Sequence, residues 1–482
     1  MNRHARNTPA LSAIAAAMLA AYGPAGAAEV DEVTELSKPE SSVSVGAGFI
    51  SHDNQRLGQY TGMRDEGAYG ILDFNLVNRD DNTGTWFKLD GRNLGLDSRE
   101  LRFEHTRQGD WGYFVEFSQT PRYSPYTVNT GLSGIGTINQ AVGGEPTRDV
   151  QLKTERKTTT LGFDKWLPAK FDFQVRFRHE EKDGSRLFGR TGTDFLAEPI
   201  DSTTRQLDAT LGYTGERLQL SGGYSGGWYN NKNPALYATG GTGSTYSPIG
   251  LPPDNESHQL HLAGGYSFTP TTRGTFKLAY ARATQNDQFI VASLPGNDSL
   301  NGRVDTTRLQ LGLNSRPFPK LSLLANFRYE DRDDKTPIRL YSNLATSTST
   351  FNGFYEERSI KTMAGKLEAG YQLPLGFRVV GGVDRDIKRR NVPSWFSGAL
   401  VSVTTREKTD ETTYRLQLRR SLSETVNGAL SYAHSKRGGS DYVTNVLNSG
   451  ATGSNLVAPL HLADRERDLW RLALDWTPTE PL

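Results

Sequence analysis

The sequence contains no cysteine in its 482 residues. Disulfides, cysteine-based metal sites and covalent haem attachment are therefore excluded, and any redox chemistry must belong to a partner. Neither sign of charge is in clear surplus, because the chain has 55 basic and 54 acidic residues. Nucleic-acid-binding chains carry a basic surplus, so this balance argues against nucleic acid as a partner.

Long apolar runs are also absent. Nothing after the N-terminal segment approaches the roughly 20 consecutive apolar residues of a transmembrane helix, and the mean hydropathy is -0.57. A helical membrane protein is therefore excluded. A transmembrane β-barrel is allowed, because only every second residue of its strands faces lipid.

The N-terminus predicts a secretion signal. Arg3 and Arg6 precede a short apolar stretch at 11–21, and residues 25–27 are small, as a cleavage site requires. We expect residues 1–28 to be a signal peptide and the mature chain to be exported through the periplasm. The alternative, a membrane anchor, lacks a following stop-transfer pattern.

Alternation of apolar and polar residues is the strongest pattern present. Residues 171–178 read FDFQVRFR, with every odd position apolar and every even position polar or charged. Strand side chains alternate between two faces, so one face is apolar and the other polar. A soluble β-sandwich could share this pattern. Alternation with unequal connections, short at one end and long at the other, behind a secretion signal is typical of an outer-membrane barrel.

Short breaks with turn residues divide the chain into repeated units of roughly 50 residues, a length typical of a repeated supersecondary unit. The breaks lie at 166–170, 214–217, 269–273, 316–320, 373–376 and 421–425. Each unit holds two strands of about ten residues, which is enough to cross a bilayer. Before residue 168, strands are predicted at 43–49, 69–77, 85–91, 99–106, 111–118 and 157–166, with a long loop at 121–150.

These units predict an all-β fold: a large antiparallel transmembrane barrel of roughly 18 or more strands over residues 29–482. The last residues, 477–482, resemble the short turns of the chain itself. We therefore expect one or more C-terminal hairpins to be missing. The alternative is a short tail after a closing strand that ends at Trp476.

Charged residues on the polar face must point into the barrel, because an Arg or Lys facing lipid near the midplane costs about 2–4 kcal/mol. We expect eight of them to face the lumen: Arg176, Arg178, Lys277, Arg308, Arg328, Arg415, Arg419 and Arg471. Two interpretations stay open for this set, an interface with a protein inside the barrel and the solvated lining of a porin.

The region 43–120 carries more than periodicity. Its short glycine- and aromatic-rich segments at 58–62, 67–69, 83–86, 91–99 and 109–113 resemble the MtrB/PioB family of decahaem-associated outer-membrane proteins. The most specific of them is GRNLGLDSR at 91–99. One departure is that the Mtr branch carries an N-terminal cysteine pair, which this chain lacks.

The resemblance implies a barrel in the outer membrane of a Gram-negative bacterium that sheathes a periplasmic multihaem c-type cytochrome. The haem is carried by that partner, and this chain holds no cofactor. Electrons then cross the outer membrane during extracellular metal reduction or iron oxidation, with a surface cytochrome outside the cell as a further partner.

Segment 91–99 has two interpretations. In the first, charged side chains contact the cytochrome: Arg92, Asp97 and Arg99. In the second, which we favour, the segment is a tight turn. Two glycines then supply unusual backbone angles and two polar side chains bond the backbone: Gly91, Gly95, Asn93 and Asp97.

The main alternative function is a passive diffusion porin without a redox partner. An outer-membrane enzyme is the weakest reading, because no nucleophile motif or paired-carboxylate arrangement stands out. The eight histidines show no metal-ligand spacing. The acidic cluster at 330–334 is predicted to lie in a loop as solvated or ion-binding surface.

Overall fold

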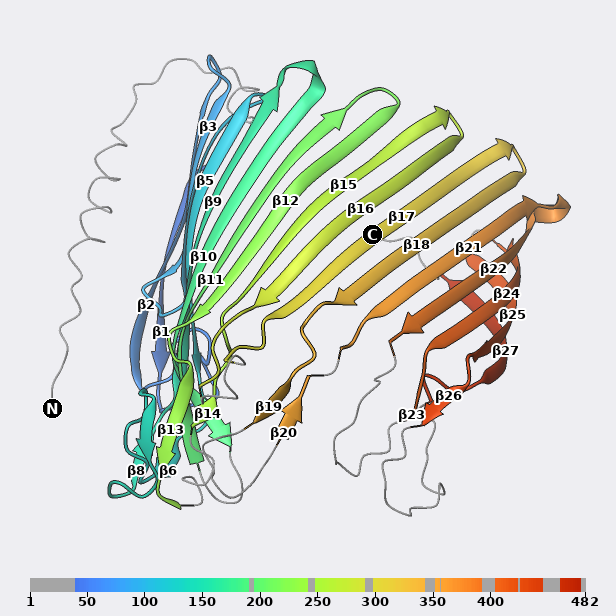
Figure 1. Cartoon of the computed structure of the whole chain (residues 1–482). Helices are drawn as coiled ribbons and strands as arrows, with labels where there is room; N and C mark the ends of the chain where they lie inside the picture. The colour runs from blue at the N-terminus through green and yellow to red at the C-terminus, as the bar shows by residue number, and fades with distance from the viewer. Residues whose placement is uncertain are drawn as a thin grey trace, which may run out of the picture.

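The computed structural model describes residues 40–189, 195–241, 248–290, 298–342, 352–355, 357–391, 404–423, 425–444 and 460–477. Its main feature is one curved sheet of eighteen strands (Figure 1). They are β1 (Ser42–Ile50), β2 (Gly67–Asp80), β3 (Thr85–Leu94), β4 (Arg99–Arg107), β5 (Trp111–Tyr123), β9 (Lys153–Leu167), β10 (Phe171–Gly189), β11 (Phe195–Thr214), β12 (Leu218–Asn231), β15 (Asn255–Thr269), β16 (Thr272–Gln285), β17 (Gly302–Phe318), β18 (Leu321–Asp334), β21 (Ile360–Gln372), β22 (Phe377–Arg390), β24 (Lys408–Ser421), β25 (Val426–Gly439) and β27 (Arg465–Trp476).

Each of these strands pairs antiparallel with the next one along the chain. Strands β1 and β27 are the two edges, and no pairing joins them within the described ranges. The predicted antiparallel all-β fold and its number of strands are confirmed.

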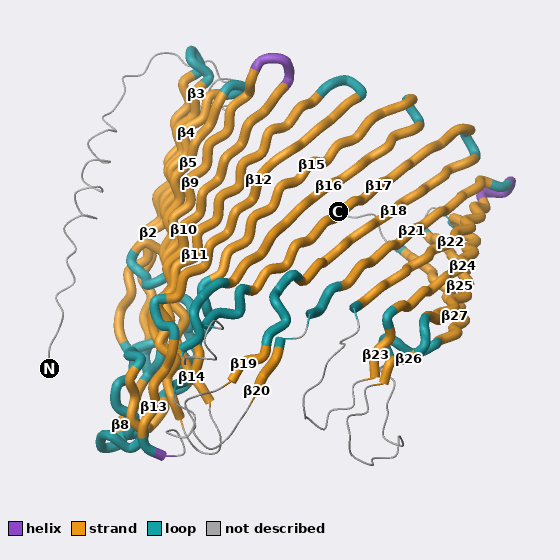
Figure 2. The backbone as a smooth tube through the Cα atoms, viewed as in Figure 1, coloured by secondary structure: helices purple, strands orange, loops and turns teal. Residues whose placement is uncertain are grey.

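The two ends of the sheet differ, as Figure 2 shows. One end carries the short turns that the sequence predicts, including the 3-10 turns Pro168–Lys170 and Pro374–Gly376. Proline fixes the first backbone angle of each turn, and the next residue, Ala169 or Leu375, takes a positive φ of 62° or 61°. The long loops all leave from the other end.

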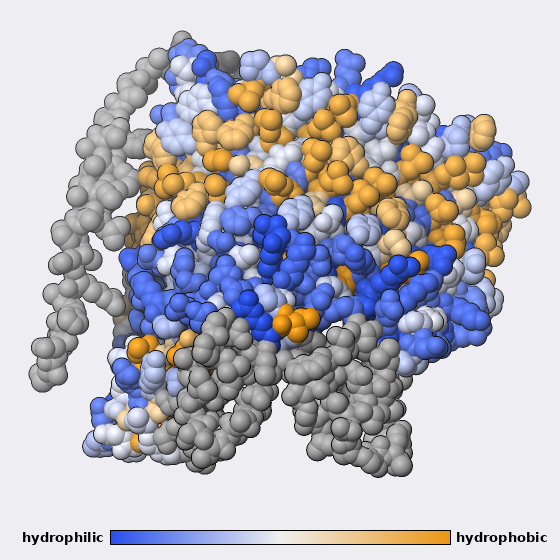
Figure 3. All heavy atoms as spheres, viewed as in Figure 1, coloured by the Kyte–Doolittle hydropathy of each residue, from blue (hydrophilic) through white to orange (hydrophobic). Residues whose placement is uncertain are grey.

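The two faces of the sheet have opposite chemistry. Between β16 and β17, Leu278 pairs with Leu309 and Phe276 with Leu311, whereas the intervening Lys277 pairs with Gln310. The apolar side chains form a band in the half of the sheet nearest the short turns (Figure 3). Many of them are exposed, which in water would be a liability but suits contact with lipid.

Two rows of aromatic side chains border this apolar band. On the loop side they are Tyr224, Tyr280, Tyr329, Tyr414 and Tyr432, and on the turn side Trp111, Tyr213, Tyr266, Tyr371 and Trp476. Aromatic rings with a polar edge favour the boundary between lipid and water. The rows therefore mark the two interfaces. We call the apolar face outer and the polar face inner.

Connections of the first half build a small packed unit at the loop end, which we call the loop module. It comprises residues 124–152, 232–241 and 248–254 with the tips of β10 and β11. Five short strands organise it: β6 (Val128–Thr130), β7 (Asn139–Ala141), β8 (Arg148–Val150), β13 (Ala235–Thr239) and β14 (Ile249–Gly250). Strand β6 pairs with β8, and β13 pairs with both β7 and β14.

The loop module has a dry core of its own. Leu132, Leu196 and Leu236 are fully buried. The amide of Gln140 donates to the Ala197 carbonyl at 2.6 Å and accepts from the Ala197 nitrogen at 3.0 Å. The expectation of a plain loop at 121–150 is wrong, because β5 continues to Tyr123 and three short strands follow.

Shorter hairpins pair within other loops: β19 (Leu340–Ser342) with β20 (Asn352–Phe354), and β23 (Thr404–Arg406) with β26 (Tyr442–Thr444). The acidic cluster 330–334, expected in a loop, lies at the end of β18. Its side chains still alternate between the two faces, and ion pairs from neighbouring strands compensate Glu330 and Asp331. The expected signal peptide, 1–28, lies outside the described residues.

Among the residues that the structure describes, no helix is both long and apolar enough to cross a bilayer.

Candidate functional site

The eight basic residues predicted to line the lumen share the inner face of the sheet. Their lateral neighbours in the register are small, polar or charged: Lys277 lies beside Ala263 and Gln310, and Arg328 beside Gln310 and Ala364. The same holds for Arg176, Arg178, Arg308, Arg415, Arg419 and Arg471. Small neighbours leave room for long side chains to extend away from the sheet.

Four of the eight form ion pairs with inner-face carboxylates. Arg178 lies 2.6 Å from Glu180. Arg308 and Arg328 share Glu330, at 3.3 and 2.9 Å, and the Arg415 guanidinium donates to Asp384 at 3.0 Å. Because two arginines share one carboxylate, the Glu330 group keeps one uncompensated positive charge.

The other four form no ion pair with any described residue. Arg419 donates to the side-chain oxygen of Gln417 at 2.7 Å, and Arg176, Lys277 and Arg471 are exposed on the inner face. An exposed, unpaired guanidinium is a ready donor to a carboxylate, and the Arg fork favours two parallel hydrogen bonds. These four side chains are the part of the inner face best suited to bind an acidic surface.

Phe114 on β5 is an inner-face aromatic residue that sequence reasoning missed. The guanidinium carbons of Arg102 and Arg176 lie 4.0 and 6.0 Å from its ring centroid. Its ring covers Gly162 of β9 so closely that a Cβ there would come within 2.0 Å of it. The sequence could have revealed it, because Phe114 is an apolar residue at an inward-facing position of β5, between the outward-facing Tyr113 and Val115.

The family-motif segment 91–99 forms the end of β3, a tight turn and the start of β4. Positive φ values occur at Asn93 (53°) and Gly95 (127°), and a Cβ on Gly95 would lie 2.3 Å from the Gly70 carbonyl oxygen. Gly91 has no positive φ. It is extended, and glycine is needed there because the ring of Phe74 lies 2.6 Å from where its Cβ would be.

Several motif segments meet in one cluster at the loop end of β1 to β5. The Asp97 nitrogen donates to the Thr61 carbonyl, and the Asp97 carboxylate accepts the Tyr123 hydroxyl at 2.5 Å. Arg64, which is buried, stacks its guanidinium 4.7 Å from the centroid of the Tyr123 ring. Burial, together with the adjacent Asp97, raises the pKa of the Tyr123 hydroxyl, which therefore stays protonated and donates.

The charged residues of segment 91–99 differ in availability. Arg99 is occupied internally, since it donates twice to the side-chain oxygen of Gln119, at 3.0 and 2.8 Å. Asp97 is held by Tyr123. Arg92 is exposed. The geometry therefore gives Asp97 and Arg99 a structural role in this cluster and leaves Arg92 accessible.

The described residues contain no group of three or more His, Asp or Glu side chains arranged to hold a metal ion.

Comparison with known proteins identifies the family to which this sheet architecture belongs. Residues 49–482 match the family model described as "outer membrane beta-barrel porin, MtrB/PioB". Outer membrane protein MtrB of Shewanella baltica (strain OS185) is 26% identical over 475 residues, which cover 92% of this chain and 65% of that protein. The chain thus spans slightly less than two thirds of the length of this relative.

Solved outer-membrane structures overlap with the chain more loosely. The copper transporter OprC is 14% identical with a TM-score of 0.43, covering 92% of this chain and 62% of that one. The FrpB iron transporter from Neisseria meningitidis (F5-1 variant) is 10% identical with a TM-score of 0.41, covering 83% and 63%. Scores this low say nothing about function. The family match covers nearly the whole chain, and the protein therefore belongs to the MtrB/PioB family of outer-membrane β-barrel proteins.

Proposed function

We propose that this chain forms the wall of an outer-membrane barrel that sheathes a periplasmic multihaem c-type cytochrome and so supports electron transfer across the outer membrane. The chain attaches no haem covalently, because it has no cysteine for a thioether bond. Its part is to keep lipid away from the cytochrome and to position it. An antiparallel sheet suits this task, since the backbone hydrogen bonds between its neighbouring strands are satisfied within the wall.

The observation that supports this proposal most is a set of inner-face cations that have no carboxylate partner among the described residues: Arg176, Lys277, Arg419 and Arg471. Haem propionates and acidic side chains on a cytochrome surface are carboxylates, the group that a free guanidinium binds best. The cations lie on β10, β16, β24 and β27. They are thus spread around the wall, as contact with a large partner requires.

The test is co-purification of haem with the tagged protein. The full chain is expressed together with a periplasmic multihaem c-type cytochrome, isolated from outer membranes, and assayed for covalent haem by haem staining after denaturing electrophoresis. We expect a haem-bearing partner in fixed stoichiometry. Replacing the four unpaired cations (R176Q, K277Q, R419Q, R471Q) should weaken its retention by about tenfold, with the wild-type complex more sensitive to salt than the variant.

The matched control removes four positive charges from the outer face instead (R303Q, K361Q, R385Q, R389Q) and should retain the cytochrome. The four inner-face replacements break no ion pair in the described part of the chain, so a folded variant is expected. A haem-free barrel that conducts ions in planar bilayers would refute the sheath and establish a diffusion porin. Equal loss from both variants would refute the inner-face contact.

A further inference from the structure

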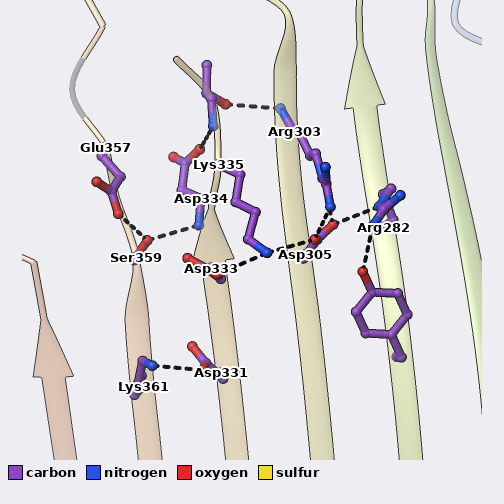
Figure 4. Close-up of polar contacts among 12 residues, drawn as sticks. Arg282, Arg303, Asp305, Asp331, Asp333, Asp334, Lys335, Glu357, Ser359 and Lys361 are labelled. Carbon is purple, nitrogen blue, oxygen red and sulfur yellow. Dashed lines mark hydrogen bonds and ion pairs between the residues drawn. The ribbon is translucent and has the colours of Figure 1, made fainter. Parts of the chain in front are cut away.

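A row of charged side chains crosses the outer face of β16 to β24 directly beyond the apolar band, on the loop side; we call it the outer charged belt. Figure 3 shows polar surface adjoining the apolar band there, and Figure 4 shows part of the row on four neighbouring strands. Its members are Arg282, Arg303, Asp305, Asp331, Asp333, Lys335, Lys361, Arg385, Arg389, Lys408 and Asp410.

The register places these residues on the same face as the apolar band. Asp305 is opposite Arg282 and Asp333. The apolar band begins at Tyr280, two residues from Arg282, and at Leu309 and Tyr329, four residues from Asp305 and Asp333. Two tyrosine hydroxyls reach from the band into the belt. The Tyr280 hydroxyl accepts from Arg282 at 2.9 Å, and the Tyr329 hydroxyl donates to Asp331 at 3.2 Å.

Within the belt, carboxylates lie at the base and cations cover them. The Asp305 side chain is only 6% exposed and is contacted by Arg282 at 2.9 Å, Arg303 at 2.7 Å and Lys335 at 3.3 Å. Those three cationic side chains are 44%, 39% and 45% exposed. One buried negative charge therefore has three positively charged partners (Figure 4). Because those partners are the more exposed groups, the surface presented is cationic.

The same layering is repeated on the following strands. Asp331 is 19% exposed beneath Lys361, which is 57% exposed and 3.0 Å away. Asp410 is 19% exposed beneath Arg385 and Lys408, at 2.7 and 3.3 Å. Arg389 is exposed and has no ion pair with any described residue. The exception is Asp333, which is exposed itself beside Lys335.

Seven basic and four acidic side chains make up the belt, so it carries three net positive charges. The Ser359 hydroxyl, which donates to Glu357 and accepts from the Asp334 nitrogen, belongs to a separate network that fastens the loop to β18. In bacterial barrels the long connections face the outside of the cell. The belt therefore lies at the level of the lipid headgroups of the outer leaflet.

We propose that the outer charged belt of β16 to β24 binds the phosphate groups of lipid A in the outer leaflet. An amphipathic ligand fits the two adjoining surfaces: acyl chains lie on the apolar band, and phosphates meet the exposed Arg and Lys side chains. Each basic side chain near an anionic lipid surface adds attraction, and the guanidinium fork matches phosphate geometry. A soluble protein partner could contact the belt but not the adjoining band, which lies against lipid.

The test measures lipid bound to the full-length protein in dodecyl maltoside by native mass spectrometry. Mixed micelles contain either bisphosphorylated lipid A or the same lipid after enzymatic removal of its phosphates, and inorganic phosphate alone is the third probe. We expect at least about tenfold more of the phosphorylated lipid to be retained than of the dephosphorylated one. Inorganic phosphate should neither bind nor displace the lipid at micromolar concentration.

The outer-face variant (R303Q, K361Q, R385Q, R389Q) should lose most of this preference. Asp305, Asp331 and Asp410 each keep a partner in it. The inner-face variant (R176Q, K277Q, R419Q, R471Q) removes the same charge from the opposite face and should retain the lipid. If the fourfold variant does not fold, the single substitution Arg389→Glu, which breaks no ion pair among the described residues, should still lower the preference by about twofold or more.

Equal retention of the two lipid A forms by the wild-type protein would overturn the proposal, as would an outer-face variant that binds as well as wild type. Binding of inorganic phosphate with the affinity of the lipid would show a plain anion site and also overturn it. Haem co-purification is read from the same preparations. Because it depends on the opposite face, failure of the lipid proposal and failure of the sheath are distinguishable.

Discussion

At the scale of single residues, the motif cluster at the loop end of β1 to β5 is held together by one half-buried phenol, that of Tyr123. Tyr123 donates to Asp97, stacks against Arg64, and its nitrogen donates to the Gln59 carbonyl at 2.9 Å. The cluster thereby joins segments that are far apart in sequence. A family motif at this position is thus explained by the packing of the first five strands, with no need for a partner.

Removing the phenol oxygen tests this role. Tyr123→Phe should lower the free energy of unfolding by about 1–2 kcal/mol, because the partly buried Asp97 carboxylate loses its donor. Urea unfolding in lipid vesicles, followed by tryptophan fluorescence, measures the difference. The control Tyr126→Phe changes an exposed phenol and should stay within about 0.5 kcal/mol of wild type. Equal effects would contradict the structural role of the Tyr123 hydroxyl.

At the scale of elements, the loop module differs from the sheet that carries it. The sheet exposes its apolar residues to lipid, whereas the module buries Leu132, Leu196 and Leu236 in a core of its own. It is attached through the tips of β10 and β11, the longest strands of the sheet. Its stability therefore depends on ordinary packing in water, and it should open separately from the membrane-embedded wall.

A cavity in the module core tests this independence. Leu236→Ala should destabilise the module by about 2–5 kcal/mol, the usual cost of truncating a buried leucine. Protease should then cut within 124–152 and 232–254, while the sheet keeps its heat-modifiable migration on gels. Tyr237→Ala, on the exposed side of the same strand, is the control. Loss of the whole folded sheet in Leu236→Ala would show that the module and the wall unfold together.

At the scale of the whole molecule, polar and apolar side chains are sorted onto three surfaces of the sheet. These are an apolar band, a cationic outer belt beside it and a polar inner face. The strands continue past the band on the loop side, so one strand such as β17 takes part in all three. Leu311 on β17 faces outward, and the preceding Gln310 faces inward beside Lys277. Adjacent positions should therefore respond in opposite ways to charge.

Charge placed on the two faces of β17 tests this assignment. Leu311→Arg should cost about 2–4 kcal/mol of stability in the membrane, because the guanidinium faces lipid. Gln310→Arg, one residue earlier, should cost less than about 1 kcal/mol, because its side chain enters the polar interior. Folding yield into vesicles and urea midpoints give both values. Similar costs at the two positions would show that the faces have been assigned wrongly.

The strands and their inward and outward phases were predictable because a period of two needs no knowledge of distant residues. The strand at 171–178 and the eight inward cations follow from that period, whereas the six short breaks follow from their turn residues. The acidic cluster at 330–334 was misplaced because composition alone suggested a loop. Its carboxylates are tolerated in β18 because Arg308 of β17 reaches Glu330 and Lys361 of β21 reaches Asp331, and those partners come from other parts of the sequence.

The sequence by itself determined the β-class, the absence of any cofactor bound through cysteine, the turn positions and the polarity of each face, because these depend on local spacing and composition. The tertiary structure decided which cations remain unpaired, that Phe114 lies over Gly162, that the loops pack a core around Leu236, and that cations cover Asp305. Each of these four features depends on which strands become neighbours and in what register. Sequence alone does not show them, because lateral strand pairing brings together residues that are far apart in the sequence.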